Sequence, residues 1–437
     1  MSRDNDEAQM EVEGDPGGDT SLSSNKRKVY VPGVSRPLRV GEELVRDQTA
    51  YQMFHDFRTG NPCLSFDTVF EQPGVLDQSS ELYIAAGTQA ERMRDNAIVL
   101  LRLRNLCCQE KGEDENSSDE SDDEDETVGE QAQFHCVEIA HHGGINRIRA
   151  INLGTQTFCA AWNDQGRVGI WSLAGPKRAI ESMSCEERNN HQKLKNEKPL
   201  FNFAGHQTEG YALDWSPCHI GSLVSGDVLS NIYLWRMGEA GGWTVDQRPF
   251  KAHTKSIEDL QWSPTEDHVF ASCSVDGSIR LWDARVSPTE ASMCAVPNAH
   301  ESDVNVISWN RHSPLILSGG DDALIKVWDL RLIQHGSPVA QFKHHNGPIT
   351  SVHWSPQDST VFAASSEDDQ TSIWDLAVEA DIDPGDGSSE KLPVPCQLLF
   401  IHQGQKEVKE VRWHSQFLGV LVTTSLDGFN VFRTISV

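Results

Sequence analysis

The 437-residue sequence lacks several features that would place it in a membrane or a secretory compartment. It has no apolar run of about 18 residues, so we expect no membrane-spanning helix. The opening MSRDNDEAQM is acidic and polar, unlike a signal or transit peptide. The ten cysteines are scattered, with no CxxC pair and none paired with a histidine at metal-ligand spacing. We therefore expect reduced thiols among apolar side chains, and neither disulfides nor a metal centre.

Sequence signatures of catalysis are also missing. The chain has no phosphate-binding loop, no cluster of metal ligands and no G-x-S-x-G nucleophile motif. We expect no enzymatic activity and no cofactor. Basic residues are outnumbered, because 37 Lys and Arg stand against 65 Asp and Glu for a net charge of −28. Such a chain does not neutralise phosphates, so we expect basic protein partners and no direct nucleic-acid binding.

What the sequence has is a repeat. Residues 253–283 read HTKSIEDLQWSPTEDHVFASCSVDGSIRLWD, and residues 300–329 read HESDVNVISWNRHSPLILSGGDDALIKVWD. Each copy opens on His, gives three short alternating strands separated by polar turns, and ends on Trp-Asp. Self-similarity with a period of about 40 to 45 residues predicts β-propeller blades, which bury their faces by stacking around an axis.

The copies resemble WD repeats, and six of them run from His142 to Phe432. Strand-like segments before them predict a divergent first blade at 63–69, 82–87, 97–103 and 134–139. The chain is therefore predicted to be all-β, with a seven-bladed WD-repeat β-propeller over residues 26–437 and a disordered acidic tail at 1–25.

Two further elements are predicted at the N-terminal side of the propeller. The seventh copy ends after its third strand, so we expect the strand-like residues 29–31 to close the ring. Residues 41–58 have apolar side chains at helical spacing and predict an N-terminal helix.

Polar side chains recur at matching positions of two blades. The two sets are His253, Ser272, Asp276 and Trp282, and His300, Ser318, Asp322 and Trp328. Ser, His and Asp together suggest a hydrolase triad, but their recurrence favours the structural hydrogen-bond network of WD repeats. The sixth copy has Ala364 where Ser is expected and the seventh lacks the Trp, so we expect those two blades to be less rigid.

The negative charge is concentrated in flexible segments. Residues 110–126 hold eleven acids against Lys111, which predicts a disordered acidic loop at 110–130 within the first blade. Ser117 and Ser121 each have an acid three residues on, the pattern that acidophilic kinases prefer. Residues 377–395 form a second insertion, with acids at Asp381, Asp383, Asp386 and Glu390.

Residues 42–66, the AAGT of 85–88 and EIAHHGGINRIR at 138–149 are similar to the histone-binding WD-repeat family. The resemblance implies that the helix at 41–58 and the acidic loop at 377–395 hold a helix of basic cargo. The cargo-binding residues would be Tyr51, Phe54, Asp381, Asp383, Asp386, Glu390, Leu398 and Phe400. The acidic loop and the ending GFNVFRTISV resemble the glutamate-rich branch, which implies core histones, a large-subunit ribosomal protein or the pre-ribosome as partners, in the nucleus and nucleolus.

A second class of function is open. Arg285 and Arg331 follow Trp-Asp in WD-x-Arg motifs, which resemble those of substrate receptors for cullin-RING ubiquitin ligases. A ligase adaptor would then be a further partner, and it could occupy one face of the propeller while cargo occupies another.

Overall fold

The computed structural model describes residues 44–69, 81–106, 132–184, 189–239, 241–379 and 394–437, with five single positions before residue 44. The chain divides into two compact units, residues 1–45 and 46–437. In the first unit, Arg36 forms a bidentate ion pair with Glu42 at 2.7 Å. The predicted tail at 1–25 and loop at 110–130 lie outside the described residues, as does the strand predicted at 29–31 apart from Tyr30.

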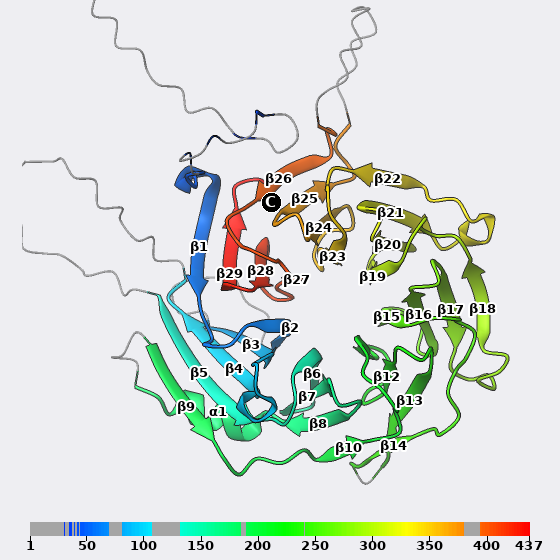
Figure 1. Ribbon diagram of the computed structural model, residues 1–437, viewed down its shortest axis with the longest axis horizontal. Coiled ribbons are helices and arrows are strands. Elements are labelled where there is room, and N and C mark those ends of the chain that lie inside the picture. The colour runs from blue at the N-terminus through cyan, green and yellow to red at the C-terminus, as the bar shows by residue number, and fades with distance from the viewer. Residues whose placement is uncertain are drawn as a thin grey trace, which may run out of the picture. The chain divides into compact units, whose positions relative to one another are not determined.

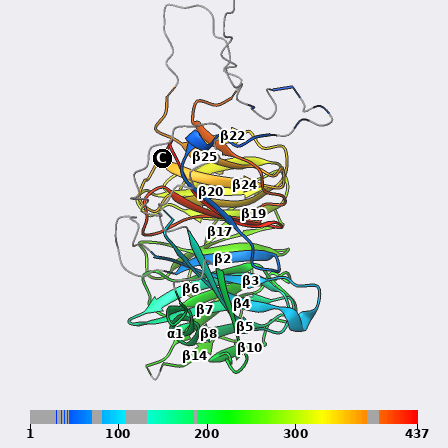
Figure 2. The same cartoon turned by 90° about the vertical axis from the view of Figure 1, so that its left-hand side faces the viewer.

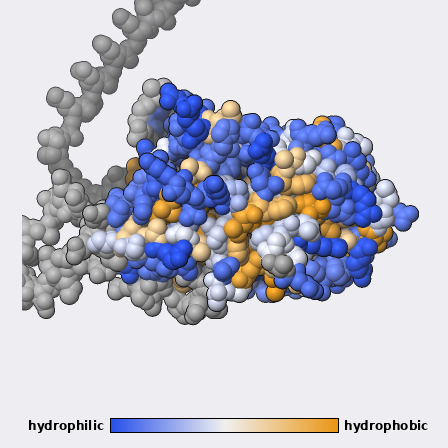
Figure 3. Space-filling view, turned by 90° about the horizontal axis from the view of Figure 1, so that it is seen from below, coloured by the Kyte–Doolittle hydropathy of each residue, from blue (hydrophilic) through white to orange (hydrophobic). Residues whose placement is uncertain are grey.

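The second unit consists of seven sheets arranged as blades around an axis (Figure 1). The prediction of a seven-bladed WD-repeat propeller is confirmed. Figure 2 shows the propeller from its side, with the strands of successive blades lying one above another. The surface facing the viewer in Figure 3 is largely hydrophilic, with a band of hydrophobic residues crossing it. None of the helices among the described residues is long and apolar enough to cross a membrane.

In each blade the first strand of the repeat lies innermost and the later strands follow outward. Blade 1 contains β2 (Cys63–Val69), β3 (Glu81–Thr88), β4 (Ala97–Arg104), β5 (Gln133–Ala140) and β9 (Asn189–Leu194). Blade 2 contains β6 (Ile145–Leu153), β7 (Gln156–Asn163), β8 (Val168–Ser172) and β10 (Phe201–Phe203). Blade 3 contains β11 (Ala212–Trp215), β12 (Leu223–Gly226), β13 (Ile232–Met237) and β14 (Trp243–Val245). All four strands predicted for the first blade are present.

The remaining blades follow the same order. Blade 4 contains β15 (Ile257–Trp262), β16 (Val269–Ser274), β17 (Ile279–Asp283) and β18 (Ser292–Val296). Blade 5 contains β19 (Val304–Trp309), β20 (Leu315–Gly320), β21 (Leu324–Asp329) and β22 (Ala340–Lys343). Blade 6 contains β23 (Ile349–Trp354), β24 (Val361–Ser366), β25 (Thr371–Asp375) and β26 (Leu398–His402). Blade 7 contains β27 (Glu410–Trp413), β28 (Val420–Ser425), β29 (Gly428–Thr434) and, outermost, β1 (Tyr51–Phe57).

The hydrophobic core lies between neighbouring blades. The second strands β16, β24 and β28 are buried along their whole length, because each is covered on both faces. In blade 4 the Phe270 ring lies 5.4 Å from Trp262 and 6.0 Å from Trp282. Phe270 also belongs to a cluster that contains Val224 of blade 3. The recurring aromatic positions of the repeat therefore form the contacts that hold one blade against the next.

The helix predicted over 41–58 is wrong for the described residues. Residues 48–50 form a short 3-10 turn, η1 (Gln48–Ala50), and residues 51–57 form strand β1, antiparallel to β29. Met53, His55 and Phe57 alternate inward along this strand, and each is at most 9% exposed. The fourth strand of blade 7 is therefore residues 51–57, not residues 29–31. An N-terminal strand does close the ring, but the sequence prediction chose the wrong segment.

Between β8 and β10 of blade 2, a polar insertion carries ordered structure that the sequence analysis did not predict. It begins with helix α1 (Ala174–Glu181), whose Ile180 packs in a cluster with Val137 and Ile139 of blade 1. It continues with β9, which pairs in parallel with β5 and gives blade 1 a fifth strand. The other short helices are η2 (Met93–Asp95) and η3 (Ile333–His335).

The inner strands are joined to one another by side-chain hydrogen bonds. The side chain that precedes the inner Trp of one blade accepts the backbone N–H of the inner Trp in the next blade. The four acceptor–donor pairs and their distances are Asp214–Trp262 at 2.7 Å, Gln261–Trp309 at 2.7 Å, Ser308–Trp354 at 3.0 Å and His353–Trp413 at 3.0 Å. These bonds join each blade from the third to the sixth to the blade that follows it, and they set the spacing between those neighbours.

The role of β1 predicts how truncations behave. A chain that begins at residue 46 keeps β1 and should melt like the full-length protein. A chain that begins at residue 59 loses Met53 and Phe57 from the core and exposes β29, so we expect a loss of about 5 kcal/mol or more in the free energy of unfolding. Urea unfolding followed by circular dichroism measures both. Equal stability of the two truncations would contradict closure by β1.

Candidate functional site

Three of the residues predicted to bind cargo, all aromatic, meet where the outer strands of blades 6 and 7 adjoin. The Tyr51 ring lies 5.4 Å from Phe54 on β1 and 5.3 Å from Phe400 on β26, with all three side chains half-buried. The Arg46 guanidinium lies 3.7 Å from the centre of the Phe54 ring. We call Tyr51, Phe54 and Phe400 the aromatic seam. The seam presents partly exposed aromatic edges at the outer rim of the ring.

Strand pairing positions the seam. Phe54 lies opposite Phe432 on β29, and Phe400 lies opposite Ile373 on β25. Leu398, at the start of β26, is half-buried and packs against the core between blades 5 and 6. The seam therefore brings together segments about 350 residues apart in the chain, as the separation of 351 between Tyr51 and His402 illustrates.

His402 anchors the seam from beneath. Its Nδ1 lies 2.8 Å from the Tyr51 hydroxyl, its Nε2 lies 3.1 Å from the Asn430 amide, and its ring stacks 4.2 Å from Phe432. Burial lowers the pKa of His402 to about 3, so the ring is neutral at pH 7. Because this set of contacts replaces the missing Trp, blade 7 has its own ordered network where lower rigidity was predicted.

The acids predicted to meet the cargo, Asp381, Asp383, Asp386 and Glu390, lie outside the described residues. Both ends of their segment are described and are joined, because the Gln397 amide donates to the Val378 carbonyl at 3.1 Å. That contact lies between the end of β25 and the start of β26. The acidic segment thus leaves and re-enters the fold at the outer edge of blade 6, next to Leu398 and Phe400. The predicted phosphorylation sites Ser117 and Ser121 also lie outside the described residues.

The repeated polar sets form structural networks. His253 Nδ1 lies 2.9 Å from Asp276 and Nε2 lies 2.7 Å from Ser272 Oγ, which accepts the Trp282 indole at 2.7 Å. Burial alone would raise the pKa of Asp276, but its hydrogen bonds to His253 and Ser278 lower it well below its usual range. Ser272 is fully buried, so its hydroxyl is closed to a substrate.

Three further blades have the same or an equivalent network. In blade 5, His300 bonds Asp322 at 2.9 Å and Ser318 at 2.7 Å, and Ser318 accepts the Trp328 indole at 2.8 Å. Blade 3 repeats the pattern with His206, Asp227, Ser225 and Trp235.

Blade 6 keeps the network despite Ala364. Ser372 on the third strand supplies the hydroxyl, which lies 2.7 Å from His345 Nε2 and accepts the Trp374 indole at 2.7 Å. Ala364 therefore does not interrupt the network, because the same bonds are made from the neighbouring strand. The lower rigidity of this blade stays a prediction.

The two WD-x-Arg arginines are exposed. Arg285 Nη2 lies 2.6 Å from Asp283, and Arg331 Nη2 lies 2.5 Å from Asp329. The arginine side chains are 65% and 73% exposed, and both follow third strands of neighbouring blades. The third strand runs in the same direction in both blades, so the residues that follow it lie on the same face of the ring. The two guanidiniums therefore lie on one face.

A buried charge cluster, missed by the sequence reasoning, lies on the inner strands of blades 7, 1 and 2. Glu410 is 2% exposed and pairs with Arg149 at 2.8 Å, Arg412 at 3.4 Å and Arg147 at 3.6 Å. Burial alone would raise the pKa of Glu410, but the three guanidiniums, Arg149 foremost, lower it to about 2. Glu410 also accepts the Phe66 N–H of blade 1 at 3.0 Å. The cluster thus joins the last blade to the first.

Sequence comparisons agree with this geometry. A family model for the histone-binding protein RBBP4 and its counterpart in the CAF1 complex matches residues 41–107, which include β1 with Tyr51 and Phe54. Models of the WD domain, G-beta repeat, match residues 245–283, 292–329 and 336–375. The fold and its repeats therefore define a WD-repeat β-propeller.

Relatives that match over most of their length identify the family within the WD-repeat β-propellers. Protein HEAT STRESS TOLERANT DWD 1 of Arabidopsis thaliana is 41% identical, covering 94% of this chain and 92% of its own length. Ribosome assembly protein rrb1 of Schizosaccharomyces pombe is 37% identical, covering 99% and 91%. Glutamate-rich WD repeat-containing protein 1 of Dictyostelium discoideum is 38% identical, covering 93% and 85%. The chain belongs to this family of glutamate-rich WD-repeat and ribosome assembly proteins.

The charge cluster predicts a pH dependence of stability. Replacing Glu410 with Gln leaves the buried Arg149 and the half-buried Arg147 and Arg412 facing a neutral amide, and we expect a loss of about 3–5 kcal/mol at pH 7. Because the folded pKa lies below the unfolded value of about 4.3, the stabilisation is present above that value and is lost as pH falls towards 2. The difference between wild type and Glu410→Gln should therefore shrink from pH 5 to pH 3 in urea titrations.

Glu407→Gln is the matched control, because Glu407 is 60% exposed and pairs only at the surface with Lys409. This variant should unfold like wild type at every pH. A Glu410→Gln protein as stable as the control at pH 7 would show that the buried cluster does not stabilise the ring.

Proposed function

We propose that this protein is a non-enzymatic acidic chaperone and scaffold that binds basic nuclear proteins in ribosome biogenesis and chromatin assembly. Core histones, a large-subunit ribosomal protein or both are its cargo, and the nucleus and nucleolus are its location. The aromatic seam, on the strand that follows the acidic insertion and on β1, is the observation that carries this proposal. The family model named for a histone-binding protein, which spans β1, and the relative named ribosome assembly protein support it.

The seam provides the apolar part of the binding surface. Half-exposed aromatic side chains on rigid strands bury a large area at little cost in side-chain entropy, which is why they often dominate binding energy. Tyr51 is held by its hydrogen bond to His402, so its ring is already oriented. A basic amphipathic helix can lay its apolar face over such an edge.

The acids at 377–395 provide the electrostatic part. The described ends of their segment, Val378 and Gln397, are hydrogen-bonded to each other at the start of β26, the strand that carries Leu398 and Phe400. We infer that Asp381, Asp383, Asp386 and Glu390 take part in binding. They would meet Lys and Arg of the cargo, and this raises the rate of association and sets orientation more than it adds affinity. The acids of residues 110–130 add a longer-range attraction for basic proteins.

The first experiment tests the seam by measuring binding of purified core histones and of isolated large-subunit ribosomal proteins. Phe54→Ala should weaken binding about fivefold or more, which corresponds to about 1 kcal/mol. Phe201→Ala is the matched control, because Phe201 is a half-buried Phe on the outer strand of blade 2. The seam proposal fails if both variants lose binding equally, or if Phe54→Ala binds like wild type.

The same assay tests the acidic segment at two salt concentrations. Replacing Asp381, Asp383, Asp386 and Glu390 with their amides should slow association at low salt and leave the melting temperature unchanged. The control removes the same number of charges from exposed positions on blades 3 and 4, namely Glu239, Glu266, Asp267 and Glu290. The competing site is the mouth of the central channel, at the axis around which the blades are arranged. If cargo protected only that mouth from hydrogen exchange and left β1 and β26 unchanged, the seam would not be the binding site.

A second candidate function is substrate reception for a cullin-RING ubiquitin ligase. The geometry of Arg285 and Arg331 favours it, because both guanidiniums are exposed on one face and are oriented by the preceding aspartates. Val286 and Leu332, which directly follow the two arginines, are 38% and 47% exposed. Together they form a mixed basic and apolar surface that a ligase adaptor could bind while cargo occupies the seam.

A pull-down with purified ligase adaptor tests this second function. The double variant Arg285→Ala and Arg331→Ala should lose the adaptor and keep histone binding. Arg248→Ala is the matched control, because Arg248 is 74% exposed and bonds Asp246 at 2.9 Å with the same two-residue spacing, but does not follow Trp-Asp. No capture by wild type, or capture by the double variant, would rule the adaptor role out.

A further inference from the structure

Three side chains of metal-ligand type meet on the outer strands of blade 1. Cys136 and Glu138 are two residues apart on β5, so they lie on the same face of the sheet. His191 lies opposite Cys136 in the parallel pairing of β5 with β9. One donor atom from each residue lies within 4.8 Å of the other two. The donors therefore surround a point that a single ion can occupy after small side-chain rotations.

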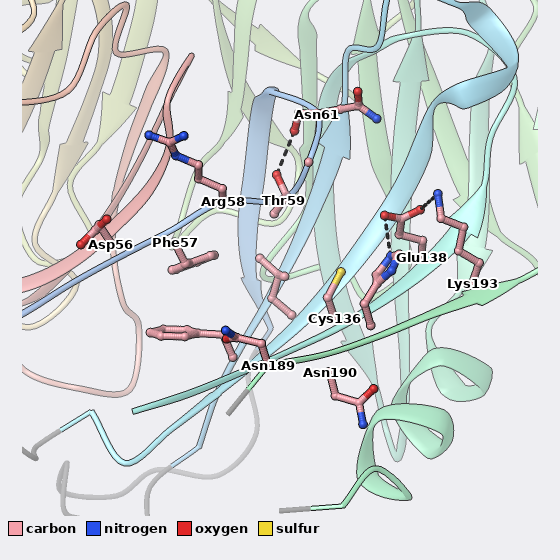
Figure 4. A pocket seen from close by; sticks show the side chains of 14 residues that line it. Asp56, Phe57, Arg58, Thr59, Asn61, Cys136, Glu138, Asn189, Asn190 and Lys193 are labelled. Carbon is pink, nitrogen blue, oxygen red and sulfur yellow. Dashed lines mark hydrogen bonds and ion pairs between the residues drawn. The ribbon is translucent and has the colours of Figure 1, made fainter. Parts of the chain in front are cut away.

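These residues line one wall of a pocket of about 720 Å³ (Figure 4). The same pocket is also lined by Phe57 and Phe134, whose rings stack at 5.2 Å. Figure 4 shows Cys136 and Glu138 side by side, with Lys193 reaching the Glu138 carboxylate. The His191 side chain is 47% exposed and that of Glu138 is 12% exposed. An ion can thus enter from solvent and is then partly shielded by protein.

Glu138 is already oriented to act as a ligand. His191 Nε2 lies 2.8 Å from Oε1, and Lys193 Nζ lies 2.9 Å from Oε2. The lysine holds one carboxylate oxygen and leaves the other turned towards the imidazole. Partners of this kind, which bond a ligand but not the ion, orient carboxylates at metal sites. The ion would take the place of the hydrogen bond between His191 and Glu138.

We propose that Cys136, Glu138 and His191 bind a zinc ion. Thiolate, imidazole and carboxylate are ligand types that zinc takes in tetrahedral sites, whereas magnesium and calcium take oxygen ligands. Three protein ligands leave the fourth position to water or to a group from a bound partner. Because His191 belongs to the inserted strand, the ion links that insertion to blade 1 and stabilises the edge of the sheet.

Binding releases one proton for each ion. The thiolate is the ligand, so the Cys136 thiol must lose its proton. The imidazole binds in its neutral form, and Lys193 keeps its pairing with the carboxylate.

The test uses full-length protein, stripped with a chelator and titrated with Co²⁺ as a spectroscopic substitute for zinc. We expect one equivalent of Co²⁺ per chain, with the charge-transfer absorption of a thiolate–cobalt bond, and its disappearance when Zn²⁺ is added. Release of one proton per ion, measured in weakly buffered solution, is a second readout.

Two variants identify the ligands. Cys136→Ser should abolish the charge-transfer band, and His191→Asn, a change on an exposed strand, should weaken Co²⁺ binding at least tenfold. Cys218→Ser and Cys396→Ser are the controls, because both replace half-buried thiols elsewhere in the propeller. The proposal is overturned if wild type binds no stoichiometric Co²⁺, or if the band persists in Cys136→Ser or is unchanged in His191→Asn.

Discussion

Closure of the ring by β1 and β29 is the contact on which the rest of the propeller depends. Blades stack in sequence, but the last sheet has only three strands from its own repeat, and β1 supplies the fourth. Phe57 stacks at 5.2 Å on both Phe429 of blade 7 and Phe134 of blade 1. The Glu410 cluster forms a second link at the same junction, near the axis. Hydrophobic burial at the rim and buried ion pairs inside thus hold the first and last blades together.

The same closure builds the candidate site. Because β1 lies on the outside of blade 7, its half-buried Tyr51 and Phe54 face β26 of the neighbouring blade. The seam therefore exists only in the closed ring, and its chemistry combines an N-terminal strand with a strand that follows the acidic insertion. Binding and closure are coupled through Tyr51, since its hydroxyl bonds His402 beneath the surface.

The buried polar groups show how a repeat tolerates variation. In blades 3 to 6 the buried histidine and the indole both find a hydroxyl partner, although different positions supply it. Ser372 replaces a second-strand serine in blade 6, and Tyr51 with Asn430 replaces the aspartate and serine in blade 7. Ala364 and the missing Trp predicted less rigid blades, because the residue at one position does not show that a neighbouring strand offers the missing group.

The class of fold and the number of blades were determined by the sequence alone, through the repeat period, the recurring His and Trp-Asp and the alternating strands. Each repeat is a unit that buries its faces only by packing against similar neighbours. The proposed role of Leu398 and Phe400 came instead from the resemblance to the histone-binding WD-repeat family. The secondary structure of residues 51–57 did not. Apolar residues at 51, 53, 54 and 57 fit both a helical face and a strand, and only pairing with β29, more than 370 residues later, selects the strand. Likewise, β9 became ordered structure, and Cys136 came to lie beside His191, because β5 offered a free edge. Non-local pairing decided these points, and a single sequence carries no record of which distant segment supplies the partner.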